Sequence, residues 1–501
     1  MSTMLIALPR AGSAQIIPIK TLPIAQGDQF DIFPSANVGM GGVSIALADT
    51  LLDPFVNPAR GVAVRTSRLL SAPTLYGISD NAGGGRTLPL GILAGTGPWF
   101  GGMALALQQI DASKTPNSGT FFPQVQWVVT NMPRPVSTPA TPSSYGNQYA
   151  FALVGRKLPD AGLALGASAS WARLTGVDGV DLLYAGSSAI HQFGHALDLR
   201  VGLFKEWPGA RTLEALALHN RFRMTHDVTY LDEIWDPAAQ QFTLRPRVVH
   251  DADETNAWGL HVGYTQPIGA GGWRLGGMLT ANRLSHPELP AYQLANVPVL
   301  PWDPGRSSAF NAGIGVSKTD GPTTFGLDVI YEPIWSYTWA DAPAPATTLV
   351  GDTIPTGGKT VENHFHFSNA VLRLGTSRSL ELGPLGKAAE LQLGLALRSV
   401  HYHLAQADHV LLTNQALDEG WIEWTPTWGL ALRFPDLEIR YRGRVTKGTG
   451  RPGVQSSGRF FAAASGAALV AGSILAAPSG PLTLQEVSTT THQVSIAVPL
   501  W

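Results

Sequence analysis

Cysteine is absent from the 501 residues of this chain, and charged residues are scarce. The absence of cysteine excludes a disulfide framework, a thiolate metal site and a cysteine nucleophile, and it fits a protein that crosses an oxidising periplasm. Charged residues make up 14% of the chain, against about 25% in ordinary soluble proteins. The net charge is −2, so the basic excess of a nucleic-acid-binding protein is missing, and we expect no nucleic acid partner.

Glycine, proline and tryptophan are plentiful instead, with 55, 37 and 14 residues. The mean hydropathy is only +0.06, which is far too low for a bundle of transmembrane helices. A transmembrane β-barrel has such a composition, because lipid-facing apolar residues alternate with lumen-facing polar residues and the two average out.

From about residue 66 the chain alternates with the period of two that is typical of a strand. In ELQLGLALR, residues 390–398, four leucines share one face and the polar or small residues share the other. We expect the polar faces of such strands to point into a lumen. The charged residues on these inward faces are Asp198, Arg200, Asp328, Glu332, Arg373, Glu390, Arg398, Arg433, Glu438, Arg440, Arg442 and Arg444.

The alternating array divides into about 16 candidate strands, whose links alternate between tight turns and long segments. The long links lie near 111–146, 231–254, 288–306, 338–363, 406–420 and 448–489. Outer-membrane barrels have this asymmetry, with short periplasmic turns and long external loops. The sequence therefore predicts an all-β fold, a transmembrane antiparallel barrel of 14 to 16 strands in a bacterial outer membrane.

Tryptophans near predicted strand ends suit the aromatic girdles of such a barrel. They are Trp99, Trp171, Trp207, Trp273, Trp335, Trp339, Trp421 and the terminal Trp501. The terminal aromatic residue also resembles the insertion signal of outer-membrane proteins, although Trp501 is one residue out of phase with the apolar face of its strand.

A glycine-rich segment precedes the array and carries a recognisable pattern. The stretch VGMGGVSIALAD (38–49) is followed by NPA, which is Asn57, Pro58 and Ala59. This pattern resembles the N-terminal signature of the FadL-like outer-membrane transporters of hydrophobic compounds, and equally that of the related PorV-type proteins. Where the family has glycine after the alanine, this chain has Arg60, with Gly61 one position later.

The resemblance implies a 14-stranded barrel whose N-terminal segment folds into the lumen as a plug. Small residues and glycines suit a chain packed in a narrow lumen, because they allow close backbone approach. We therefore predict a plug over 15–65 and a barrel over 66–501. The residues expected to hold the plug or contact a ligand are Val38, Gly39, Met40, Gly41, Gly42, Asn57, Pro58 and Ala59. The predicted lumen charges either bond the plug or line water.

Two other segments allow alternative interpretations. Residues 1–14 resemble the end of a secretory signal whose basic start is missing, or are an ordinary terminus. Residues 460–485 carry no charge and could be read as a transmembrane helix, but their Gly, Ser and Ala content favours an external loop. Apolar loop residues that could capture a ligand are Phe121, Phe122, Phe460 and Phe461.

Other chemistry finds little support in the sequence. The pairs His364 with His366 and His401 with His403 share a strand face and could grip a metal. Their places near outer strand ends favour an interfacial role, and we predict neither metal nor cofactor. GMGG lacks the Lys and Ser/Thr of a phosphate-binding loop. No serine, histidine and carboxylate converge as a hydrolase requires, so we expect no enzyme.

Two functions fit these observations. The first is a channel for passive uptake of hydrophobic or amphipathic small molecules, fatty-acid-like, with outer-membrane lipids and the small ligand as partners. The alternative is a PorV-like scaffold or carrier that binds an envelope protein partner. A continuous apolar path through the lumen would favour the channel, whereas charged inward faces count against it.

Overall fold

The computed structural model describes residues 29–64, 66–112, 134–135, 144–178, 187–286, 293–294, 297–298, 305–342, 344–382, 388–452 and 484–500. Its main sheet has 18 strands, all paired antiparallel. The long ones are β3 (Gly83–Thr96), β4 (Trp99–Asp111), β6 (Ser144–Leu158), β7 (Leu163–Leu174), β8 (Ala189–Trp207), β9 (Arg211–Asp236), β10 (Gln241–Ile268), β11 (Trp273–His286), β14 (Gly305–Asp320), β15 (Thr323–Asp341), β18 (Lys359–Glu381), β19 (Ala388–Asp408), β20 (Thr413–Phe434), β21 (Leu437–Pro452) and β22 (Leu484–Pro499).

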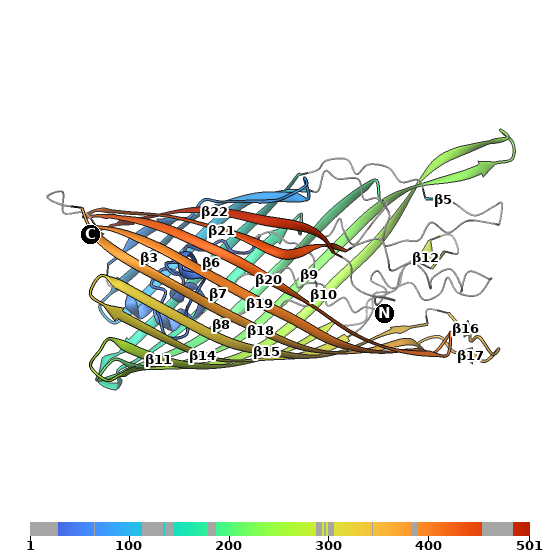
Figure 1. Ribbon diagram of the computed structural model, residues 1–501. Helices are drawn as coiled ribbons and strands as arrows, with labels where there is room; N and C mark the ends of the chain where they lie inside the picture. The colour runs from blue at the N-terminus through green and yellow to red at the C-terminus, as the bar shows by residue number, and fades with distance from the viewer. Residues whose placement is uncertain are drawn as a thin grey trace.

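The sheet closes on itself where β22 pairs with β1 (Arg68–Ser71) and β2 (Thr74–Ile78). These two short strands occupy one position in the ring, interrupted at Pro73, which cannot donate to the ladder. The remaining member, β5 (Arg134–Pro135), only touches β9. Among the described residues, sixteen strand positions therefore complete the ring (Figure 1), which confirms the predicted barrel.

Short turns lie at one end of the barrel, together with the C-terminal end of β22 (Figure 1). The opposite end carries the longer links, including the small strand pairs β12 (Gln293–Leu294) with β13 (Val297–Pro298) and β16 (Ala346–Thr347) with β17 (Thr353–Ile354). A single short helical turn, η3 (Pro159–Ala161), lies in the turn between β6 and β7.

Two of the predicted long links are wrong. Residues 231–254 continue β9 and β10 as a paired hairpin with a tight turn at 237–240, and residues 406–420 continue β19 and β20 around 409–412. In these stretches the strands lack the apolar face of a membrane-spanning strand. They remain paired because inter-strand hydrogen bonds join backbone groups and need no particular side chain.

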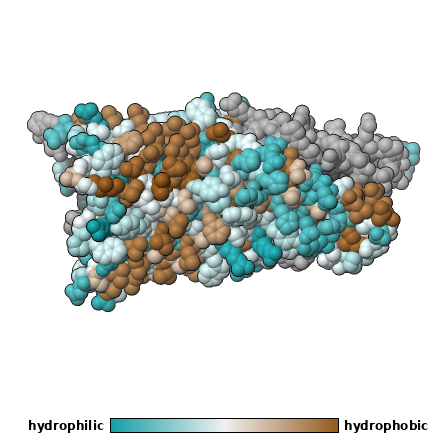
Figure 2. Space-filling model, turned by 60° about the horizontal axis from the view of Figure 1, so that its bottom comes forward, coloured by the Kyte–Doolittle hydropathy of each residue, from teal (hydrophilic) through white to brown (hydrophobic). Residues whose placement is uncertain are grey.

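An apolar belt surrounds the barrel. Large side chains that point outward from the wall stay highly exposed, as Leu105, Leu279 and Ile314 show with 67%, 65% and 65% exposure. The belt forms the brown region over one half of the face in Figure 2. Polar side chains cover most of the wall beyond it, up to a smaller brown region at the far end. An apolar surface of this extent on a closed barrel is a lipid-facing surface. The protein thus spans a bacterial outer membrane, with the longer links on the external side.

Helices play a small part in this fold. Within the described residues, no helix is long and apolar enough to span a bilayer. Those of the N-terminal segment are η1 (Val38–Met40), α1 (Asp53–Val56) and η2 (Pro58–Ala63).

Candidate functional site

Residues 29–64, which we call the lumen segment, lie inside the ring of strands towards the end with the short turns (Figure 1). Its turns follow from local sequence. Gly41 ends η1 in the left-handed conformation with φ of 73°, which glycine adopts without strain. Asn57 caps η2 by accepting a hydrogen bond from the Ala59 amide at 3.1 Å, and Pro58 follows at the first helical position, where no amide hydrogen is needed.

Asp49, the last residue of the stretch VGMGGVSIALAD, ties the lumen segment together. It is 3% exposed, and its carboxylate accepts hydrogen bonds from the Ser35 hydroxyl and from backbone amides on both sides. Those amides are Ala36 at 2.7 Å, Asn37 at 3.2 Å, Leu51 at 3.2 Å and Leu52 at 3.0 Å. The Asn37 side chain completes the loop by donating to the Val43 carbonyl at 3.0 Å.

The glycines bring this backbone into contact with the barrel wall. The Gly41 amide donates to the Thr427 hydroxyl at 2.9 Å, and that hydroxyl donates to the Gly39 carbonyl at 3.0 Å. A Cβ on Gly41 would stand 2.7 Å from the Leu374 oxygen and 2.8 Å from the Leu395 oxygen. The wall approaches equally closely, because a Cβ on Gly394 would clash with the Met40 backbone.

We expect Gly41→Ala to displace the lumen segment. Gly97→Ala is the matched control, because Gly97 also has positive φ but has no atom within 4 Å of its Cβ position, so both variants carry the same backbone strain of about 1–2 kcal/mol. The chain has no cysteine, so Val43→Cys, at a fully buried position, reports displacement by maleimide labelling. Faster labelling is expected with Gly41→Ala alone. Equal labelling rates in the two backgrounds would contradict the close packing.

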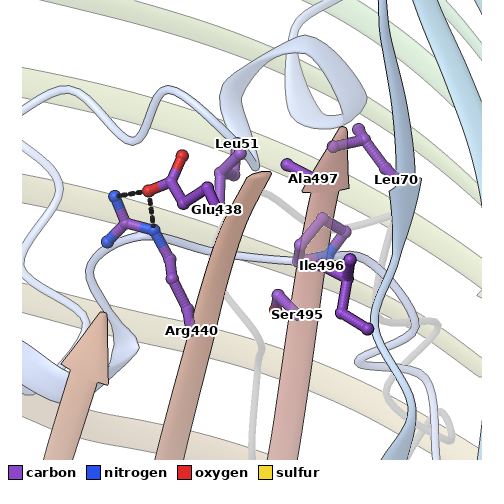
Figure 3. A pocket seen from close by; sticks show the side chains of 8 residues that line it. Leu51, Leu70, Glu438, Arg440, Ser495, Ile496 and Ala497 are labelled. Atoms are coloured by element: carbon purple, nitrogen blue, oxygen red, sulfur yellow. Dashed lines mark hydrogen bonds and ion pairs between the residues drawn. The ribbon is translucent and has the colours of Figure 1, made fainter. Parts of the chain in front are cut away.

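Apolar contacts fix the lumen segment to the strands β1 to β9. Phe33 stacks on Phe55 with ring centroids 4.1 Å apart, and both rings contact Phe151 of β6 at 5.2 Å. Leu51 packs where the first and last strands meet: Figure 3 shows it near Leu70 of β1 and Ala497 of β22. The lumen segment therefore covers the seam that closes the barrel.

Polar contacts from the barrel wall also hold the lumen segment, and five of the predicted lumen charges provide them. The Asp328 carboxylate accepts hydrogen bonds from the amides of Ser44 at 2.7 Å and Ile45 at 3.2 Å. Four arginines bind oxygens of the lumen segment. Arg200 donates to the Val56 carbonyl at 2.7 Å, Arg373 to the Gly42 carbonyl at 3.1 Å and Arg442 to the Ser35 carbonyl at 3.1 Å, and Arg444 pairs with the Asp31 carboxylate.

The other seven predicted lumen charges form ion pairs within the wall. Asp198 accepts from Arg200 at 2.7 Å, and Arg398 lies 3.7 Å from Glu332. A network at the short-turn end joins Arg433 to Glu390. The same network joins Glu438 to Arg440 at 2.5 Å, and Figure 3 shows this second pair. Mutual pairing reduces the cost of burying these charges.

Arg60, which stands where the family pattern has glycine, has a defined place. Its guanidinium pairs with Asp53 and with Glu214 of β9, the latter at 2.8 Å. Burial raises the pKa of the Asp53 carboxyl to about 7, although the adjacent Arg60 guanidinium acts in the opposite direction. The departure from the pattern is thus compensated by a partner on the wall, and the turn forms as η2.

A cavity of about 330 Å³ remains between the lumen segment and the wall. Its lining includes four of the predicted plug residues, Val38, Gly41, Gly42 and Asn57. Charged side chains, namely Arg60, Glu214, Arg373, Arg398 and Arg442, also line it. Many of these groups are charged or hydrogen-bonding, so the cavity suits water or the polar end of a ligand.

An inner apolar wall lies on the lumen face towards the external end. Its side chains, buried against one another, are Ala309, Ile334, Phe365, Phe367, Val400, Tyr402, Leu404 and Trp421, from β14, β15, β18, β19 and β20. The rings of Phe367 and Tyr402 lie 5.4 Å apart. Trp421 therefore points inward and is 8% exposed, so its predicted place in an outer girdle is wrong.

The sequence signal for the inner apolar wall is the alternation itself. His364 and His366 are exposed on β18 while Phe365 and Phe367 are buried, and on β19 the exposed residues His401 and His403 flank the buried Tyr402. The sequence pattern made the exposed histidines conspicuous, although the functional candidates are the buried aromatic residues that alternate with them. Sequence analysis also missed Gln392, whose amide donates to the Ala36 carbonyl at 2.9 Å, and Glu214.

Some predictions fall on residues outside the described part of the chain and stay predictions. These residues are Phe121, Phe122, Phe460, Phe461, the stretch 460–485 and Trp501. In the part of the chain that the structure describes, no group of three or more His, Asp or Glu side chains is placed to hold a metal ion.

Comparison with known proteins gives similar folds only. No family model matches the chain, and no curated protein matches it. Among solved structures, it is similar to a FadL homologue of Pseudomonas aeruginosa, with TM-score 0.45, 11% identity and coverage of 95% of this chain and 100% of that one. It is also similar to the toluene transporter TodX of Pseudomonas putida (TM-score 0.38, 11% identity, coverage 96% and 100%) and to a bacterial polysaccharide outer membrane secretin (TM-score 0.37, 6% identity, coverage 87% and 99%).

Proposed function

We propose that this protein is an outer-membrane channel for the passive uptake of hydrophobic or amphipathic small molecules, such as fatty acids, and that residues 15–65 are its plug. The inner apolar wall carries this proposal. The lumen of a hydrophilic pore is lined by polar groups in contact with water, whereas five adjacent strands here present aromatic and aliphatic side chains to the lumen. Such a surface favours an apolar ligand over a solvated one.

A polar zone directly follows the inner apolar wall along the strands. On β19, Arg398 is the next inward residue after Val400, and on β20 the Trp421 indole donates to Glu423 at 3.2 Å. Arg398 and Glu423 also line the cavity beside the lumen segment. A ligand with an apolar tail along the wall and a polar head at Arg398 would match this order, which supports an amphipathic substrate.

The route past the lumen segment requires it to shift. Its hydrogen bonds to Thr427, Asp328 and Arg373 cross to one wall while its phenylalanines pack against the other. We infer that a ligand passes from the inner apolar wall to the cavity and leaves when these contacts open. Transport by this route is passive, and the concentration gradient of the ligand drives it.

Uptake of a fluorescent long-chain fatty acid into proteoliposomes tests the proposal. The double variant Phe367→Ala, Tyr402→Ala removes two apolar side chains, each contributing about 1.5–3 kcal/mol when buried, so we expect roughly tenfold slower uptake or more. His366→Ala with His403→Ala is the matched control, because these outward neighbours lie on the same two strands. Unchanged uptake by a correctly folded Phe367, Tyr402 variant would rule out the wall as the ligand surface.

A second candidate function is that of an envelope scaffold or carrier. Exposed apolar residues at the external end favour it. Leu349 and Val350 are 73% and 67% exposed near the β16 and β17 pair, and Leu412 is 52% exposed in the neighbouring turn. Native mass spectrometry of the protein extracted from its own membranes in mild detergent separates the two functions. A bound lipid-like mass supports the channel, and a stoichiometric protein without a small ligand supports the scaffold.

A further inference from the structure

Two arginines and two serines form a group on the outer face of β11 and β14. The register pairs Arg283 with Ser308 and Ser285 with Arg306. The residues that alternate with them, Asn282, Leu284, Ser307 and Ala309, are buried, so these four side chains share the outward face. Directly opposed residues lie about 5 Å apart. This group, which we call the Arg/Ser quartet, can therefore contact a single ligand.

Aromatic residues flank the Arg/Ser quartet on both sides. Trp258 of β10 pairs with Arg283 and is 63% exposed, and Trp335 of β15 pairs with Ser308 and is 48% exposed. The Arg306 guanidinium lies 5.4 Å from the centre of the Tyr337 ring. Tryptophan and tyrosine at the edge of an apolar belt mark the level of the lipid headgroups.

The apolar belt begins directly beside the Arg/Ser quartet. Towards the short-turn end, the next outward residues on the same strands are Ala281 and Leu279 on β11, and Phe310, Ala312 and Ile314 on β14. The quartet lies near the external ends of its strands, where β11 ends at His286 and β14 begins at Gly305. A lipid of the outer leaflet would therefore place its acyl chains on the belt and its headgroup at the quartet.

The charges around the Arg/Ser quartet select an anionic headgroup. The nearby outward carboxylates are already paired, Glu254 with Arg221 at 2.7 Å and Glu362 with Lys359 at 2.6 Å. Among the described residues, no ion pair joins Arg283 or Arg306 to a carboxylate. Two guanidinium groups with two hydroxyls match the acceptor oxygens of a phosphate monoester, which arginine binds through paired hydrogen bonds.

We propose that the Arg/Ser quartet binds the phosphate of a phosphorylated glycolipid in the outer leaflet, with Trp258 and Trp335 beside the sugar. This site lies on the outside of the barrel and does not depend on what passes through the lumen. It would hold one lipid against β11 and β14.

Native mass spectrometry and a titration with purified bisphosphorylated lipid A test the proposal. We expect Arg283→Ala with Arg306→Ala to weaken binding by about tenfold or more, because each variant position loses a charge-assisted contact. Arg156→Ala is the matched control: Arg156 also lies over a tryptophan, 5.3 Å from Trp99, but at the opposite edge of the belt. Lipid A without phosphates should bind the native and double-variant proteins equally weakly.

Three results would overturn the proposal. They are equal binding of lipid A by the native and the double-variant protein, equal binding of the two lipids by the native protein, and complete displacement of lipid A by millimolar inorganic phosphate, which would indicate a site for free phosphate. Retained heat-modifiable migration on gels shows that the variant barrel is folded. Fatty acid uptake by the double variant should stay unchanged, so failure of this site is distinguishable from failure of the channel.

Discussion

Liposomes that contain the chain without residues 35–61 should become permeable to small hydrophilic sugars, whereas liposomes with the full chain should not. A ring of sixteen strands is wide enough for an aqueous channel when nothing fills it. In the full chain, Phe55 packs against one side of the lumen while Ser44 and Gly41 bond the other. Removing these contacts should raise the swelling rate by roughly tenfold or more.

The control for this deletion shortens the β9–β10 hairpin at the register pair Leu231 and Pro246, with a two-residue Asn-Gly turn that such hairpins favour. This variant also shortens the chain, but it does so at the external end and leaves the lumen segment in place, so sugar permeability should not change. A deletion variant that folds and remains sealed would show that residues 35–61 are not what closes the lumen.

Asp49→Ala should release the lumen segment while the barrel stays folded. The substitution removes the acceptor of five hydrogen bonds at a buried position. Because buried donors left without partners cost about 1–3 kcal/mol each, we expect a loss of at least about 3 kcal/mol of docking free energy. The measurements are maleimide labelling of Val43→Cys and sugar permeability, both of which should increase.

Asp49→Asn refines this prediction, because an amide keeps one acceptor oxygen and should give an intermediate effect. Asp436→Ala is the matched control, since Asp436 is exposed in the turn between β20 and β21. A labelling rate for Asp49→Ala equal to that of Asp436→Ala would mean that the carboxylate does not hold the lumen segment.

The barrel was predictable because each membrane-spanning strand repeats the same two-sided pattern. Leu391, Leu393, Leu395 and Leu397 lie on the outward face of β19, as the alternation indicates. The external parts of the strands were not predictable on the same rule. Beyond the belt the outside meets water and sugar, so polarity inverts: His366 faces outward and Phe367 inward. A rule that assigns every apolar residue to the lipid misplaces these residues.

The candidate site was partly predictable for a different reason. Glycines and small residues in 39–48 indicated close approach, which Gly41 makes. Which wall residue meets which segment residue depends on how the lumen segment folds inside the closed ring, and the pattern of a single strand does not specify this. Thr427 and Gln392, uncharged residues of ordinary strands, therefore became visible as partners of the lumen segment only in three dimensions.

The position of the lumen segment constrains how the chain assembles. The segment precedes the first strand, yet Asp31 pairs with Arg444, 413 residues further along the chain. Contacts this distant in sequence form late and slowly. Because β22 closes on β1 directly over Leu51, we expect the segment to be in place when the ring shuts. The part synthesised before the strands is then the core around which the sheet wraps, and a copy moved behind β22 would have to enter a closed cylinder.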